Sequence, residues 1–271
     1  MRAAVVAGTF YPGQPEQLAA NVSELLAAVD ASELVARPKA LIVPHAGYIY
    51  SGPTAAAAYA SLADNAEQIR RVILLGPVHR IPVRGLALPD VEAFATPLGT
   101  IELDRAAISN ISSMPQVVVS TAAHRFEHSL EVQLPFLQTV LDDFKLVPIA
   151  VGDASAEQVA EVIEKLWGGP ETLIVVSSDL SHFHSYRSAT QIDQQTVASI
   201  LDLRSLNSHE QACGATPING LLQVARRHGL KPELIDLCNS GDTAGDKERV
   251  VGYTSIAFHD AENLLGTPHV H

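Results

Sequence analysis

The chain has 271 residues, of which 47% are hydrophobic and 18% charged, so it can form a substantial core and is not a disordered or coiled-coil protein. Thirty acidic residues outnumber 18 Lys and Arg, and the resulting net charge of −12 argues against nucleic acid or an anionic membrane as a partner. Two cysteines are too few for a disulfide scaffold or a cysteine-rich zinc module.

We do not expect the first residues to form a secretory signal. Residues 1–12 contain no continuous apolar run, and no stretch approaches the roughly 18 apolar residues of a membrane-spanning helix. We therefore expect a cytoplasmic protein without a membrane anchor. The tail at residues 267–271 has no apolar period, and we expect it to fray.

Helical and strand patterns alternate along the chain. In its first half we predict a helix at 18–29, a strand at 40–43, a helix at 54–62, and strands at 72–75, 83–88 and 98–103, after which Asp104 caps a helix. The second half predicts a helix at 130–141, with Pro135 in its first turn or at a kink, a strand at 146–151 and a helix at 157–167. A strand at 173–176, helices at 189–201 and 217–227, and strands at 234–237 and 250–258 follow.

This alternation predicts the fold class. The predicted strands are continuous apolar runs, which is typical of a mostly parallel sheet covered by helices on both faces. We find no repeat and no linker-like change of composition. The sequence thus indicates an α/β protein with a single domain over residues 1–271.

Three of the predicted strands are followed by polar clusters that contain histidine. His45 follows the strand at 40–43, His79 follows the strand at 72–75, and Asp179 and His182 follow the strand at 173–176. The carboxyl ends of parallel strands share one edge of the sheet, where ligands bind in open α/β folds. Imidazole is both a common metal ligand and a general base, and two histidines with a carboxylate would resemble a non-haem iron site.

Three other segments have both a functional and a structural interpretation. His124 to His128 spells H-x-x-E-H, as in inverted zinc peptidases, but the helical pattern begins only at Leu130, so we expect His124 in a loop. The loop at 239–246 is either a turn or the source of a missing carboxylate. Cys213 and Cys238 lack the electropositive surroundings of a thiolate nucleophile, and we expect both to be structural.

Several ordered motifs resemble those of the Memo family, whose prokaryotic members are called AmmeMemoRadiSam system protein B. The resemblance covers Val6 to about Phe258. Its motifs are Ala7-Gly8-Thr9-Phe10-Tyr11-Pro12, Pro44-His45-Ala46-Gly47-Tyr48 with Ser51-Gly52, Leu75-Gly76-Pro77-Val78-His79, Glu127-His128-Ser129-Leu130-Glu131, Ser177-Ser178-Asp179-Leu180-Ser181-His182, and Cys213-Gly214 before Pro217-Ile218.

That resemblance implies a three-layer α/β/α sandwich similar to the class III extradiol ring-cleaving dioxygenases. It implies that His45 and His79 are metal ligands, and that His182, with Asp179 beside it, matches the dioxygenase base. Animal members use a late cysteine as the third ligand. Counted back from Tyr253, that position holds Thr243, so we expect Asp242 next to it to be the third ligand here.

Two functions of different classes follow. The first is an Fe(II)-dependent dioxygenase or other oxidoreductase that acts on a small catechol-like chelating substrate, with Zn or Cu as alternative metals. The second is an accessory protein that binds a metal or ligand and works with a radical SAM partner and an AMMECR-type protein, as the name of the prokaryotic group implies. A zinc hydrolase is a distant third.

Overall fold

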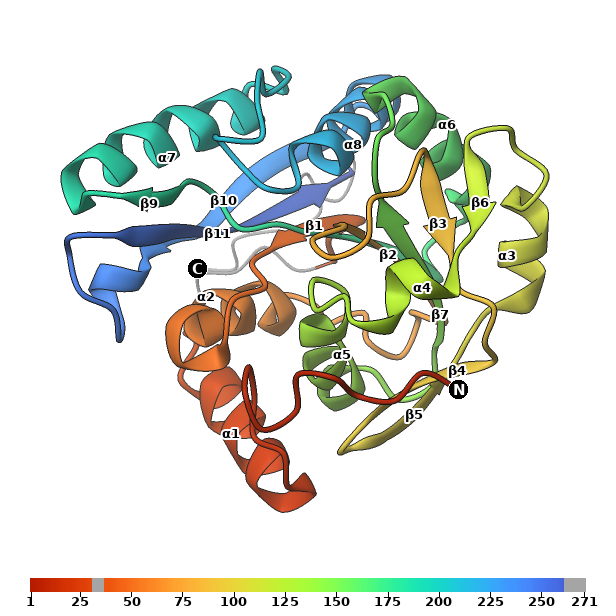
Figure 1. The fold of residues 1–271 in the computed structure, drawn as a ribbon, viewed down its shortest axis with the longest axis horizontal. Helices are drawn as coiled ribbons and strands as arrows, with labels where there is room; N and C mark the ends of the chain where they lie inside the picture. Colours follow the sequence, from red (N-terminus) through yellow and green to blue (C-terminus); the bar gives the residue numbers. More distant parts are fainter. Residues whose placement is uncertain (31–36, 261–271) are drawn as a thin grey trace, which may run out of the picture.

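A mixed β-sheet runs through the centre of the molecule, and its four middle strands are parallel (Figure 1). The computed structural model describes residues 1–30 and 37–260, so the expected fraying of 267–271 lies outside the described residues. In spatial order the middle strands are β1 (Ala40–Val43), β8 (Thr172–Ser177), β2 (Arg71–Pro77) and β7 (Lys145–Val151). Their side chains are almost entirely buried because helices cover both faces.

Antiparallel pairs extend this parallel centre on both sides. Next to β1 lies β11 (Val250–His259), which also pairs with β10 (Lys231–Asn239) and with the short β9 (His182–His184). Next to β7 lies β3 (Leu86–Leu88), which pairs in parallel with β6 (Val117–Val119). The hairpin of β4 (Ala93–Thr96) and β5 (Gly99–Glu102) forms a separate two-stranded sheet.

Helices form a layer on each side of the sheet, which confirms the predicted α/β sandwich (Figure 1). On one side α2 (Tyr48–Ala60) packs on β1, β10 and β11 and contacts α1 (Pro15–Ala27) and α5 (Leu134–Val140). The opposite layer contains α3 (Arg105–Ile111), α6 (Ala156–Leu166), α7 (Tyr186–Leu201) and α8 (Ala215–His228). Among the described residues, no helix is long and apolar enough to cross a lipid bilayer.

Most of the predicted elements are present, with shifted limits. Asp104 caps α3 as expected, since its carboxylate accepts a hydrogen bond from the Ala107 N–H at 2.9 Å. The helix expected at 130–141 is divided into a 3₁₀ turn (Glu131–Gln133) and α5, in which Pro135 occupies the first turn, where no intrahelical N–H is needed. The expectation that His124 lies in a loop is wrong, because it belongs to the short helix α4 (Thr121–Arg125).

Candidate metal centre

The carboxyl ends of β1 and β2 bring His45 and His79 together, as the sequence predicts. β8 lies between these two strands and pairs in parallel with each of them, so all three strands end at the same edge. The ring centroids of His45 and His79 are 5.2 Å apart in an edge-on arrangement. His45 is buried, whereas the His79 side chain is 29% exposed, so the pair connects the interior with solvent.

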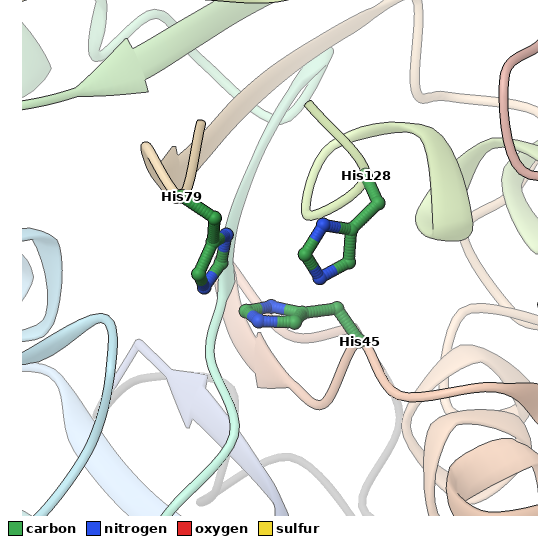
Figure 2. A group of neighbouring side chains, drawn as sticks. All are labelled: His45, His79 and His128. Atoms are coloured by element: carbon green, nitrogen blue, oxygen red, sulfur yellow. The ribbon is translucent and has the colours of Figure 1, made fainter. Parts of the chain in front are cut away.

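A third histidine, His128, completes the group. It comes from the segment between α4 and the 3₁₀ turn, and its ring centroid lies 4.6 Å from that of His79 and 5.4 Å from that of His45. One ring nitrogen from each histidine can be chosen so that all three lie within 4.8 Å of one another (Figure 2). These three side chains could hold a metal ion. The sequence analysis noted His128 only within a peptidase-like pattern and a family motif.

A buried hydrogen-bond network determines which nitrogen of His45 faces the group. The Ser177 hydroxyl donates to the Ser129 carbonyl at 2.6 Å and accepts from the Gln133 amide at 2.8 Å. Its single proton is therefore used, so His45 Nδ1, 2.9 Å away, must carry a proton and donate it to Ser177. The lone pair of His45 Nε2 is then free for a metal ion, as in many metal sites whose ligand histidines donate from the opposite nitrogen.

Glu127 orients His79 in the same way. Its carboxylate accepts hydrogen bonds from His79 Nδ1 at 2.8 Å and from the backbone N–H groups of His79 at 2.6 Å and of His128 and Ser129 at 3.0 Å each. Burial alone would raise the pKa of Glu127, but these hydrogen bonds and the nearby His79 ring lower it to about 2. An ionised Glu127 keeps the proton on His79 Nδ1, which leaves Nε2 free.

The path of the chain brings Glu127 and His128 close to the end of β2. A Cβ atom at Gly76 would lie 2.8 Å from the Ser129 hydroxyl, so only glycine allows this close approach. From the other side, the Arg2 guanidinium donates to the carbonyls of His124 and Glu127 at 2.6 and 2.5 Å and forms a buried ion pair with Glu131 at 2.7 Å. The N-terminal segment therefore fixes the loop that carries His128.

Electrostatics favours the neutral, metal-binding form of the His45 and His128 rings. Burial lowers the pKa of His45 well below its ordinary value, and the neighbouring His79 and His128 rings lower it further. Burial, followed by the effect of His79, also lowers the pKa of His128. Neutral imidazoles with converging lone pairs are a donor set for later first-row divalent ions rather than for Mg²⁺ or Ca²⁺, which prefer oxygen. The residues present thus fit the metal that the family resemblance implies.

Asp179 and Cys213 lie against His45. The Oδ2 atom of Asp179 is 4.0 Å from His45 Nε2, while its Oδ1 accepts the His45 backbone N–H at 2.7 Å. Burial raises the pKa of Asp179, although the His45 N–H and the His182 ring favour its ionised form. Cys213 Sγ lies 3.4 Å from His45 Nε2. Both side chains could therefore contact a metal ion or its ligand.

The position of Cys213 beside His45 is one that the sequence analysis did not predict. The count along the sequence places the late cysteine at Thr243, but the Thr243 hydroxyl donates to the Ser240 carbonyl at 3.3 Å. Cys213 instead sits just before α8, where its N–H donates to the Asp179 carbonyl at 3.2 Å. The motif of Cys213-Gly214 before Pro217 was the available signal. Cys238, by contrast, contacts the Thr54 hydroxyl at 3.1 Å.

His182 is close enough to His45 to lower the pKa of that ring, but it does not belong to the three-histidine group. Its Nδ1 is 2.9 Å from the Leu180 carbonyl, which can only accept, so Nδ1 carries the proton and Nε2 is the basic nitrogen. His182 begins β9, which pairs with the start of β11 at Val251. This tautomer is the one that a general base working through Nε2 requires.

The structure does not bring Asp242 to the histidines. Its carboxylate accepts a hydrogen bond from the Tyr186 hydroxyl at 2.6 Å and from the Asn239 N–H at 3.0 Å, within the 3₁₀ turn Ser240–Asp242. The Asp242 carboxylate thus serves as a hydrogen-bond acceptor within its own turn, in a capping box with Asn239. His128, and not Asp242, is the third member of the histidine group.

His124 also lies apart from the group, so the H-x-x-E-H pattern does not act as a unit. His124 Nε2 contacts the Ala87 carbonyl at 2.8 Å, and its ring packs edge-on against Phe94. Burial lowers the pKa of His124 to about 4. Only Glu127 and His128 of the pattern reach the other histidines, so the zinc-peptidase arrangement of two histidines on one helical face is absent from this segment.

Comparisons with known proteins agree with the motifs. The family model described as "Memo-like protein" matches residues 2–257. A MEMO1 family protein of Archaeoglobus fulgidus is 34% identical over 95% of this chain and 99% of its own, and one of Aquifex aeolicus is 35% identical over the same shares. A solved structure of the uncharacterized protein JW3007 from Escherichia coli K12 aligns with a TM-score of 0.49 and 14% identity, over 81% of this chain and 99% of that one, which is too remote to bear on function. By its sequence relatives and its motifs, this chain belongs to the Memo-like protein family.

Proposed function

We propose that this protein is a metal-dependent oxidoreductase whose divalent ion, Fe(II) in the first instance, is bound by His45, His79 and His128. We propose His128 as the third ligand in place of Asp242. The observation that carries the proposal is the convergence of three ring nitrogens within 4.8 Å, oriented from outside by Ser177 and Glu127. Three protein ligands leave coordination positions open for a chelating substrate and a small molecule such as dioxygen.

The substrate class follows from the groups beside these ligands. When bound, Fe(II) would supply Lewis acidity and redox chemistry toward dioxygen. A vicinal diol such as a catechol must lose a proton to chelate well, and the unprotonated Nε2 of His182 would accept it. Asp179, buried against His45 and close to His182, would stabilise the resulting imidazolium. We therefore propose a catechol-like substrate and His182 as general base.

A second candidate function is favoured by one observation, the thiol of Cys213 beside His45 Nε2. A soft sulfur donor next to imidazoles suits Zn or Cu(I) better than Fe(II). A protein that binds such an ion tightly and transfers it, or a bound intermediate, to a radical SAM or AMMECR-type partner would use the same site without turnover. We expect the metal preference to separate the two candidates.

Oxygen uptake tests the first candidate. Protein loaded anaerobically with Fe(II) should consume about one O₂ per catechol for at least one member of a panel of substituted catechols. His79→Ala should lose both metal and uptake, while His182→Gln should retain metal and lose most of the uptake. No uptake with any catechol, together with tight Zn or Cu binding and co-purification with a radical SAM partner, would replace it with the second candidate.

A further inference from the structure

The segment from Asp179 to His182, which carries two of the proposed working residues, is held from outside the site. Gly252 on β11 binds it through two backbone hydrogen bonds, from Leu180 N–H to the Gly252 carbonyl at 2.8 Å and from Gly252 N–H to the Ser181 carbonyl at 2.9 Å. On α7, the Asp193 carboxylate accepts the Ser181 N–H at 3.0 Å. Asp193 therefore connects the helical layer to the segment Asp179–His182, called the active segment below.

Asp193 is an unusual residue for a purely structural role. Its side chain is buried, at 2% relative exposure, and among the described residues its Oδ2 atom has no hydrogen-bond partner. The carboxylate lies so close to β11 that a Cβ atom on Gly252 would be 2.0 Å from Oδ2. Burial raises the pKa of Asp193 to about 6, so the folded chain carries a charge that is costly to bury. Such groups concentrate at functional sites.

The hydrogen bonds connect this carboxylate to His182 through a single peptide group. The N–H of Ser181 and the carbonyl of Leu180 belong to the same planar peptide unit and point in opposite directions. Asp193 binds the N–H end, and His182 Nδ1–H donates to the carbonyl end at 2.9 Å. The carboxylate thus fixes the peptide whose oxygen sets the ring orientation and tautomer of His182, and it polarises that oxygen into a stronger acceptor.

We propose that Asp193 is a positioning residue for His182 and acts through the Leu180–Ser181 peptide group to hold the His182 ring in its Nδ1–H tautomer and in one orientation. This inference rests on the proposed role of His182 as general base. The arrangement is the counterpart of a carboxylate that orients a catalytic histidine directly, with one peptide unit inserted between the two side chains.

The first test compares two substitutions of Asp193 in the Fe(II)-loaded protein with the most active catechol. Asp193→Asn retains an oxygen acceptor for the Ser181 N–H and should keep kcat within about threefold of wild type. Asp193→Ala removes the acceptor and should lower kcat about tenfold or more, a fraction of the roughly 10²–10⁴-fold effect of a general base. KM and Fe(II) affinity should change less than about threefold, because the three-histidine group does not depend on this contact.

Thr196→Val is the matched control. Thr196 is also buried on α7, but its hydroxyl donates to Ile192 of the same helix, at 2.9 Å, rather than to the active segment. We expect full kcat from this variant. Equal losses of kcat in Asp193→Ala and Thr196→Val, or equal losses in the Asn and Ala variants of Asp193, would show that Asp193 only supports folding and would overturn the proposal.

A second variant tests whether the position of the Asp193 carboxylate matters as well as its presence. Gly252→Ala should displace the Asp193 carboxylate, since the new Cβ would lie 2.0 Å from Oδ2. We expect it to lower kcat as Asp193→Ala does, and the double variant to be no worse than either single variant. Additive losses would mean that the two residues act independently, which contradicts the proposal.

Nitrogen-15 NMR of the histidine rings tests the inference without any turnover. The His182 signals are identified by their loss in His182→Gln. In wild type, His182 should be in the Nδ1–H tautomer, and Asp193→Ala should shift it toward a mixture, while Asp193→Asn should not. If wild type turns over no catechol but shows this pattern, the proposed function fails and the positioning role stands. If the tautomer is insensitive to Asp193→Ala, the positioning role fails by itself.

Discussion

Glu127→Gln should weaken metal binding in addition to lowering the stability of the fold. The carboxylate of Glu127 accepts four N–H groups, three through Oε1 and the His79 backbone N–H through Oε2 at 2.6 Å. Glutamine can keep the three bonds at Oε1, but its NH₂ group would then face the His79 N–H as a second donor. His79 would lose the charged partner that fixes its ring and also the acceptor that fixes its backbone.

The expected magnitude follows from these contacts. Loss of an outer partner of a metal ligand costs about 10- to 100-fold in metal affinity, or about 1.4–2.7 kcal/mol. The unpaired His79 N–H adds a stability cost of about 1–3 kcal/mol in both metal-bound and metal-free protein, so it mostly cancels in the binding measurement. We therefore expect the Kd for Zn²⁺ and Fe²⁺ to rise about 10- to 100-fold, measured by competition with a chromophoric chelator.

Glu131→Gln is the matched control for this prediction. Glu131 is equally buried and accepts hydrogen bonds from Arg2, the Tyr11 hydroxyl and the N–H groups of Val5 and Val6, but its carboxylate has no hydrogen bond to a site histidine. Urea unfolding should show a clear loss of stability, while the metal Kd should rise less than in Glu127→Gln, because Arg2 can keep its bonds to the His124 and Glu127 carbonyls. Equal metal affinities in wild type and Glu127→Gln, or equal losses in the two glutamine variants, would refute the assignment of Glu127 as the partner that orients His79.

Three further outcomes test the site and its surroundings. His128→Ala should raise the Kd for divalent metals about tenfold or more in the same competition assay, whereas Asp242→Ala should change it less than about threefold, because the Asp242 carboxylate is engaged in its own turn. Cys213→Ser should lower Cu(I) and Zn affinity more than Fe(II) affinity, and Cys238→Ala should change none of them; uniform effects across the metals would remove Cys213 from the site. Burial raises the pKa of Asp193 from 3.8 to about 6, so the contribution of its protonated carboxyl group to the free energy of unfolding is complete below pH 4 and is lost as the pH rises through 6. Urea unfolding should therefore find Asp193→Asn more stable than wild type by up to about 3 kcal/mol at pH 7.5 and nearly equal to it at pH 4.

The sequence could predict the part of the site that follows directly from parallel strands. His45 and His79 come immediately after buried apolar runs, and in a parallel sheet such positions share one edge whatever the rest of the chain does. His182 could be placed near that edge for the same reason, since it follows β8. Local pattern and sheet geometry were sufficient for these three residues.

His128 and Cys213 could not be placed by such reasoning because distant contacts decide their positions. The loop of His128 is fixed by Arg2, more than 120 positions earlier in the chain, and by its close approach to Gly76. Cys213 is fixed through the Asp179 carbonyl and through the fit of Gly214 against Ser178, where a Cβ would lie 2.7 Å from the serine side chain. Neither contact leaves a periodic signal in the sequence.

The electrostatics of this site favour a bound cation over an anion. Two buried carboxylates, Glu127 and Asp179, lie against the site histidines, and burial favours the neutral form of the His45 ring, so these carboxylates would repel an anionic ligand that binds without a metal ion. A divalent cation bound at the three ring nitrogens would reverse this balance, because it would favour the ionised form of Asp179 and take up lone pairs of His45 and His79. Binding of an anionic or chelating substrate would then become favourable as a second step. Under the proposed function, we therefore expect the metal ion to bind first and the chelating substrate second, because of the charges beside the three histidines.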